Sequence, residues 1–179
     1  MTHPGEVIEY WLSIGPGGWF RRDDDVDETI RSRFGSLHHE ASVHKLDHWI
    51  DEPEHALALI LILDQFSRNM FRNDARAFAQ DEHARGLAKS ALSAGHEKLV
   101  SNQLKPFFYL PLMHSESIAD QERCVCLFHA ANDPESLKFA IIHRNIILRF
   151  GRFPHRNPAL GRHMTPAEQA FLDGGGFSA

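Results

Sequence analysis

Residues 56–63 read Ala-Leu-Ala-Leu-Ile-Leu-Ile-Leu, and this run decides the fold of the chain. Wound into a helix, it places apolar side chains on every side for about two turns. Such a helix has to be covered by neighbouring elements on most of its faces. Pro53 lies just before the run, and proline suits the first turn of a helix. We therefore expect a central helix over residues 53–72 with the other elements packed around it.

Helical patterns continue on both sides of this run. No pair of alternating apolar and polar segments is joined by an Asn-Gly or Asp-Gly turn, so we expect no sheet. The connections are short, which is typical of antiparallel neighbours, so the sequence predicts an all-α stack of helical hairpins with about seven or eight helices. Besides the central helix, the expected helices cover residues 4–12, 23–41, 75–94, 117–131 and 134–150, with a short last one from Thr165. The first of them should end at the glycine-rich stretch 15–18, and Thr165 and Glu168 have the spacing of a capping box at the start of the last one.

Length, charge and the distribution of apolar residues indicate what class of protein this is. A chain of 179 residues suits a single domain, residues 1–179, that buries its core without a disulfide or a structural metal. The formal net charge of −5 argues against general nucleic-acid binding. The longest apolar run is too short for a bilayer, and residues 1–6 lack the features of a signal peptide. We expect a cytoplasmic protein with no membrane partner, in which Cys124 and Cys126 are reduced, packed thiols.

The chain holds thirteen histidines, but no His-Glu-x-x-His or Cys-x-x-Cys spacing. We therefore expect no metal site and no cofactor. Several histidines stand singly among polar residues and are expected on solvated helix faces. These are His38, His39, His44, His48, His83 and His96.

The first polar segment that could carry chemistry is residues 63–72, at the end of the central helix. Asp64 and Arg68 lie four apart and share a helix face, with Arg72 one turn further on. Because Asp64 follows so apolar a stretch, we expect its carboxylate to be partly buried and paired. Two interpretations stay open: a pair that only fixes helix packing, and the polar floor of a binding pocket.

The second segment is aromatic, residues 106–113, and runs directly into His114 and Glu116. Pro111 interrupts a run that is too aromatic to be exposed. A histidine beside carboxylates can act as a general acid or base. His114 is therefore the best candidate for a proton-transfer group.

The third segment is cationic, because residues 136–167 contain no Asp or Glu. We expect His143 to face inward, since it shares a helix face with Ile147, while Arg152, His155 and Arg156 follow in an aromatic and cationic loop. Clustered guanidinium groups attract carboxylates or phosphates. Either an internal salt-bridge network, with its acid supplied by another element, or a pocket for an anionic ligand would explain the cluster.

These three segments, together with residues 7–12 and Trp19-Phe20, resemble the bacterial proteins grouped as the domain of unknown function 924 family. The similarity covers nearly the whole chain. It implies a tetratricopeptide-like stack of antiparallel helices, an α-α superhelix, and it implies no assigned activity. Ser67 stands where the family motif would have proline, which makes a kink in the central helix less expected here.

Together the segments predict a protein that binds an anionic small molecule or a peptide. In this hypothesis Arg152 and Arg156 hold the anionic group, and Asp64 either orients Arg68 or accepts a hydrogen bond from the ligand. A hydrolase or transferase that uses His114 as acid or base, and a purely structural polar network, are the alternatives, and the sequence leaves enzyme activity and oligomeric state open. The proposed site residues are Asp64, Arg68, Arg72, His114, Glu116, His143, Arg152, His155 and Arg156.

Overall fold

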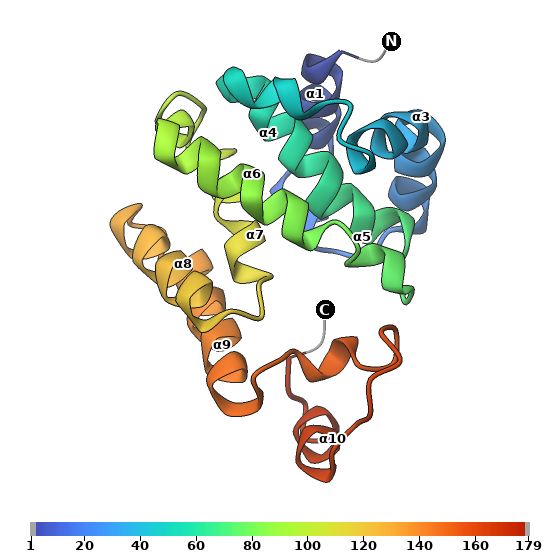
Figure 1. Cartoon of the computed structure of the whole chain (residues 1–179), viewed down its shortest axis with the longest axis vertical. Coiled ribbons are helices and arrows are strands. Elements are labelled where there is room, and N and C mark those ends of the chain that lie inside the picture. The colour runs from blue at the N-terminus through green and yellow to red at the C-terminus, as the bar shows by residue number, and fades with distance from the viewer. Residues whose placement is uncertain (1–2, 178–179) are drawn as a thin grey trace. The chain divides into compact units, whose positions relative to one another are not determined.

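The computed structural model describes residues 3–177, and this part of the chain folds into helices and contains no strand (Figure 1). The all-α prediction is confirmed. The chain divides into two compact units. The first unit holds the residues up to 72 together with 76–111, and the second holds residues 73–75 and those from 112 onward. The single-domain expectation stays a prediction. Met1 and Thr2 belong to the stretch that was compared with a signal peptide, and they lie outside the described residues.

The first unit is built around α4 (Pro53–Leu61), which continues without a break into a π-helical turn (Ile62–Phe66) and α5 (Ser67–Met70). Residues 56–63 are at most 1% exposed, so the prediction of a central helix covered on most of its faces is confirmed. The other helical elements of this unit are α1 (Pro4–Ile14), α2 (Pro16–Trp19), α3 (Asp24–Ser42), a 3-10 turn (Asp47–Asp51), α6 (Asp81–Ala94) and two further 3-10 turns (His96–Lys98 and Lys105–Phe108).

The central helix is not regular, contrary to the expectation for residues 53–72. A π turn has hydrogen bonds from i to i+5 and inserts one residue, which shifts the phase of the following side chains by about 100°. The turn spans Ile62–Phe66 and includes Asp64. Just after it, the Ser67 hydroxyl donates to the Leu63 carbonyl at 2.6 Å and contacts His38 Nε2 at 2.8 Å. This stretch is therefore not a regular α-helix, although position 67 is serine and not proline.

Two other boundaries differ from the sequence prediction. The helix expected over residues 75–94 begins only at Asp81, after a 3-10 turn (Ala75–Ala77). Asp81 and Glu82 then occupy the first turn of α6, where acidic side chains interact favourably with the helix dipole. The glycine-rich stretch 15–18, expected only to end the first helix, forms α2, and the Trp19 indole donates to the Trp11 carbonyl at 2.6 Å.

The second unit contains the helical hairpin of α8 (Ile118–Ala130) and α9 (Pro134–Phe150), followed by a 3-10 turn (Pro154–Arg156) and α10 (Pro166–Asp173); α7 (Leu110–Met113) spans the boundary of the units. Gly151 adopts a left-handed conformation, φ +69°, directly after α9. Thr165 and Glu168 form the predicted capping box of the last helix. Tetratricopeptide-like stacking of the hairpins stays a prediction.

The two cysteines face different surroundings, as their spacing on α8 requires. Cys124 is buried, and burial raises the pKa of its thiol to about 12, so this thiol is inert at neutral pH. Cys126 is exposed, so the prediction that both thiols are packed is wrong for Cys126. Among the described residues, none of the helices is both long enough and apolar enough for a membrane span.

Candidate functional site

Asp64 lies on the π turn of the first unit and is 1% exposed, as expected for an acid inside an apolar helix. Its carboxylate is 3.0 Å from Arg68 Nη1 and accepts from the Gln65 amide at 2.6 Å, so the predicted Asp64–Arg68 pair is confirmed. Arg68 also donates to both carboxylate oxygens of Asp81, at 3.0 and 3.1 Å. Burial lowers the pKa of Arg68, but Asp64 and Asp81 outweigh it and hold this pKa above its usual value.

Arg72 does not join this group but binds Asp27 of α3. Its Nη2 donates to Asp27 Oδ1 at 2.8 Å and its Nε donates to Oδ2, while the Asn69 amide donates to Oδ1 at 2.7 Å. The hydrogen bond to Asp27 raises the pKa of Arg72. Sequence reasoning missed Asp27, although the signal was present: Asp27 falls at helical spacing with the core residues Ile30 and Phe34 and is itself buried.

The Asp27–Arg72 pair lines a polar cleft of about 340 Å³ in the first unit. Its outer wall has two further ion pairs, Arg22 with Asp24 at 3.0 Å and Arg31 with Glu28. Arg31 also donates to the Met70 carbonyl at 3.1 Å. We refer to this feature as the Arg72 cleft. Its lining residues are Arg22, Asp24, Asp27, Glu28, Arg31, Asn69, Met70 and Arg72.

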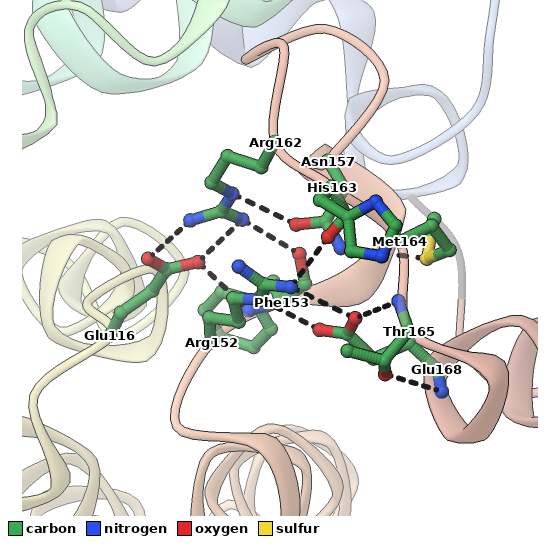
Figure 2. Close-up of polar contacts among 9 residues, drawn as sticks. All are labelled: Glu116, Arg152, Phe153, Asn157, Arg162, His163, Met164, Thr165 and Glu168. Carbon is green, nitrogen blue, oxygen red and sulfur yellow. Dashed lines mark hydrogen bonds and ion pairs between the residues drawn. The ribbon is translucent and has the colours of Figure 1, made fainter.

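In the second unit, Arg152 is bound by Glu168 at the start of α10 (Figure 2). Arg152 Nε and Nη2 donate to the two carboxylate oxygens at 2.6 and 2.9 Å, and Nη2 also donates to the His163 carbonyl at 2.7 Å. Arg152 and the Thr165 backbone N–H hold the pKa of Glu168 far below its usual range. Sequence reasoning identified Glu168 only as a capping residue, so the acid partner of Arg152 was missed.

Glu116 forms another ion pair of this unit, with Arg162 (Figure 2). Arg162 donates to both of its carboxylate oxygens, at 2.8 and 3.0 Å, and further to Asn157 Oδ1 and the Phe153 carbonyl. The Phe153 N–H donates to Glu116 at 2.8 Å. Burial raises the pKa of Glu116, but Arg162 and this N–H outweigh it and lower the pKa. Glu116 is therefore an acid of an internal network, one of the two interpretations that the sequence left open.

The remaining predicted residues of the second unit gather around the fully buried Phe153 ring. The rings of His143 and His155 lie 5.5 and 5.6 Å from it, and Arg156 Cζ lies 4.6 Å above it. His143 is buried, as predicted, and its Nδ1 contacts the Phe139 carbonyl at 2.8 Å. Arg156 donates to the His114 carbonyl at 3.0 Å, which ties the His114 backbone to this group.

The predicted site residues thus form two groups. Glu116, His143, Arg152, His155 and Arg156 lie near Phe153 in the second unit, with His114 bound through its carbonyl. We refer to these residues, together with their partners Arg162 and Glu168, as the network around Phe153. The other three belong to the first unit, where Asp64 and Arg68 pair with each other and Arg72 pairs with Asp27. Convergence of both groups on one pocket, and a proton-transfer role of His114, stay predictions.

Contrary to expectation, the isolated histidines are not all solvated. His39, His44 and His48 are exposed, whereas His38 and His96 are buried. Burial, with a contribution from His39, lowers the pKa of His38, which contacts Ser67 of the central helix. A polar neighbourhood in the sequence does not reveal which helix face meets the core.

Comparison with known proteins places the chain in a family. No curated protein matches it. A family model described as a bacterial protein of unknown function, DUF924, matches residues 7–176. The chain belongs to the DUF924 family. The family resemblance inferred from the motifs is thereby confirmed, and the match includes every residue of the Arg72 cleft and of the network around Phe153.

A solved structure is similar over most of the chain. It is that of ATU0120, a protein of unknown function from Agrobacterium tumefaciens. The TM-score is 0.92 at 42% sequence identity, and the similarity covers 96% of this chain and 97% of the other. This structure supports the helical fold, and its description carries no activity that could be transferred.

Proposed function

We propose that this DUF924 protein binds a small anionic molecule, or the carboxylate of a peptide, in the Arg72 cleft. The observation that carries the proposal is how firmly each of the three guanidinium groups that line the cleft is held by its acid partner. Arg72 is held by the buried Asp27, whereas the acids paired with Arg22 and Arg31 are exposed. The outer two guanidinium groups are therefore the ones that a ligand can recruit.

The outer ion pairs are weak because both partners are solvated. The side chains of Arg31 and Glu28 are 50% and 67% exposed. Exposed pairs of this kind contribute about 0–1 kcal/mol. A carboxylate or phosphate that binds the guanidinium at two points can replace Glu28 or Asp24 at small cost. Glu28 and Asp24 then act as place-holders for the ligand anion.

The inner pair supplies a rigid base for such a ligand. Asp27 accepts from Asn69 and from two nitrogens of Arg72, and it is buried among the residues that line the cleft. Breaking a buried pair leaves an uncompensated charge, so the ligand does not displace Asp27. Arg72 is thus held in one orientation, which reduces the side-chain ordering that binding requires.

The second unit is less suited to anion binding, although its residues led to that hypothesis. Arg152 and Arg162 each bind a carboxylate at two points, with Glu168 and Glu116 as partners. An anionic ligand would have to displace a carboxylate that is already well hydrogen-bonded. This contrast supports the structural-network interpretation for the second unit and the binding interpretation for the cleft.

The proposal is tested by isothermal titration and thermal shift with inorganic phosphate, dicarboxylates and short peptides. We expect at least one of these to bind the wild type and to raise its melting temperature, because a ligand that binds only the native state stabilises it. Arg31→Gln should lower the affinity about tenfold or more, since a hydrogen bond to a charged group contributes about 1.5–3 kcal/mol.

The matched control is Arg123→Gln, which removes the same charge from an exposed position on α8. Its affinity should equal that of the wild type. Equal losses in both variants would indicate a general charge effect, and equal affinity in all three proteins would exclude the cleft as the binding site.

Two further expectations belong to this proposal. They are a cytoplasmic place of action and tetratricopeptide-like stacking, which would present the cleft on a helical surface as such repeats do. Cell fractionation followed by immunodetection tests the first, and superposition of an experimental structure on tetratricopeptide repeats tests the second.

A further inference from the structure

A second cluster of polar side chains lies in the first unit and takes no part in the Arg72 cleft. It consists of His44 and Asp47, which follow α3, and His83 on α6. His44 Nδ1 lies 2.9 Å from Asp47 Oδ2, and His83 Nε2 lies 2.8 Å from Asp47 Oδ1. The two imidazole rings are 4.0 Å apart, centroid to centroid. Both histidines therefore direct a nitrogen at one carboxylate.

The backbone at His44 is unusual for a residue with a side chain. The Lys45 N–H donates to the Glu40 carbonyl at 3.1 Å and the His44 N–H donates to the Ala41 carbonyl at 3.0 Å, which together form a Schellman motif at the end of α3. His44 occupies the position where this motif most often has glycine, with φ +64°. Glycine would adopt this conformation at lower cost. The chain instead has an imidazole there, aimed at Asp47.

We propose that His44, Asp47 and His83 bind a divalent transition-metal ion of the zinc class. One ligand atom from each residue can be chosen so that all three lie within 4.8 Å of one another. Two imidazole nitrogens and one carboxylate oxygen are a common donor set for Zn²⁺, whose bonds to such atoms measure about 2.0–2.2 Å. Contacts of 2.8 and 2.9 Å need to open only slightly to admit an ion at those distances.

The donor set also disfavours the hard cations and leaves room for water. Mg²⁺ and Ca²⁺ prefer oxygen ligands, whereas this cluster offers one carboxylate and two nitrogens. Three protein ligands leave the fourth tetrahedral position of Zn²⁺ to solvent. Solvent can reach that position because the side chains of His44 and Asp47 are 64% and 41% exposed.

One feature limits the expected affinity. When Nε2 of a neutral histidine binds a metal, its Nδ1 carries the proton and usually donates it to an acceptor. Within residues 3–177, the buried Nδ1 of His83 finds no hydrogen-bond partner. We therefore expect weaker binding than in structural zinc sites. This inference is independent of the proposed anion binding, because the two sites share no residue.

The test is calorimetric titration of the full chain with ZnCl₂, and with MgCl₂ for comparison. We expect one Zn²⁺ per chain and no binding of Mg²⁺. Asp47→Asn and His83→Gln should each lower the Zn²⁺ affinity at least about tenfold, an effect that even outer-shell partners reach in metal sites. His39→Gln is the matched control, since it removes an exposed histidine of α3 outside the cluster, and its affinity should be unchanged.

His44→Gly separates metal binding from folding. Glycine is the preferred residue at this left-handed position, so the variant should fold and have a melting temperature without metal that equals or exceeds that of the wild type. Its Zn²⁺ affinity should nevertheless fall at least about tenfold. Unchanged Zn²⁺ affinity in His44→Gly and His83→Gln, or the absence of a one-to-one complex in the wild type, would overturn the proposal.

Discussion

The Arg72 cleft and the network around Phe153 both contain arginines paired with acidic residues, but the pairs differ in how far they are buried. In the network Arg152 and Arg162 each bind a carboxylate at two points, with Glu168 and Glu116 as their partners. In the outer cleft, Arg22 and Arg31 meet exposed acids. Arginine content alone therefore does not indicate an anion site. What matters is how firmly each guanidinium is already held.

The largest expected effect concerns the centre of the network. Phe153→Ala removes a fully buried ring that contacts His143, His155 and Arg156, and should lower the free energy of unfolding by about 3–5 kcal/mol. Urea unfolding followed by circular dichroism measures this. Leu148→Ala, at an exposed position of α9, is the control with little expected change. A loss below about 1 kcal/mol for Phe153→Ala would show that the network does not depend on this ring.

A smaller effect is expected from one of its ion pairs. Arg162→Met removes both hydrogen bonds that this guanidinium donates to Glu116, a partly buried carboxylate. The free energy of unfolding should fall by about 1.5–3 kcal/mol, the usual contribution of hydrogen bonds to charged groups. The same urea experiment applies, and wild-type stability of Arg162→Met would contradict a structural role of the network.

The network should also make stability depend on pH. The pKa values of Glu116 and Glu168 are lowered in the folded chain from the ordinary value of 4.5. Such groups contribute stability that is present above the unfolded pKa and is lost as pH falls through the folded pKa. The melting temperature should therefore decline as pH is lowered below about 4.5.

Glu168→Gln should flatten this decline, because the amide does not titrate. Glu122→Gln, an exposed position on α8, should leave the decline unchanged. Thermal unfolding between neutral and acidic pH measures both variants. Identical profiles for Glu168→Gln and the wild type would show that Glu168 does not contribute to the pH dependence of stability.

The smallest change in stability is expected in the cleft, and it gives the sharpest contrast with the network. Glu28→Gln removes an exposed partner of Arg31 and should change the free energy of unfolding by less than about 1 kcal/mol. If Glu28 holds the place of a ligand anion, the same variant should bind inorganic phosphate or a dicarboxylate more tightly than the wild type. Weaker binding by Glu28→Gln would contradict the place-holder role.

Several features could be predicted because the interacting residues are neighbours along a helix. The all-round apolar run at residues 56–63 specifies a buried helix by its spacing alone. The Asp64–Arg68 pair spans four residues, and the Thr165–Glu168 capping box spans three. Such local geometry is the same wherever the helix lies in the fold.

The partners of the functional groups required the tertiary structure. Arg72 binds Asp27, 45 positions away, and Glu116 binds Arg162, 46 positions away. His83 meets Asp47 across 36 positions, and that spacing matches no metal motif. The π turn at Ile62–Phe66 likewise escaped prediction, because the apolar run that precedes it is compatible with an uninterrupted α-helix. Chain spacing determines which residues share a helix face, and only the packing of helices decides which faces meet.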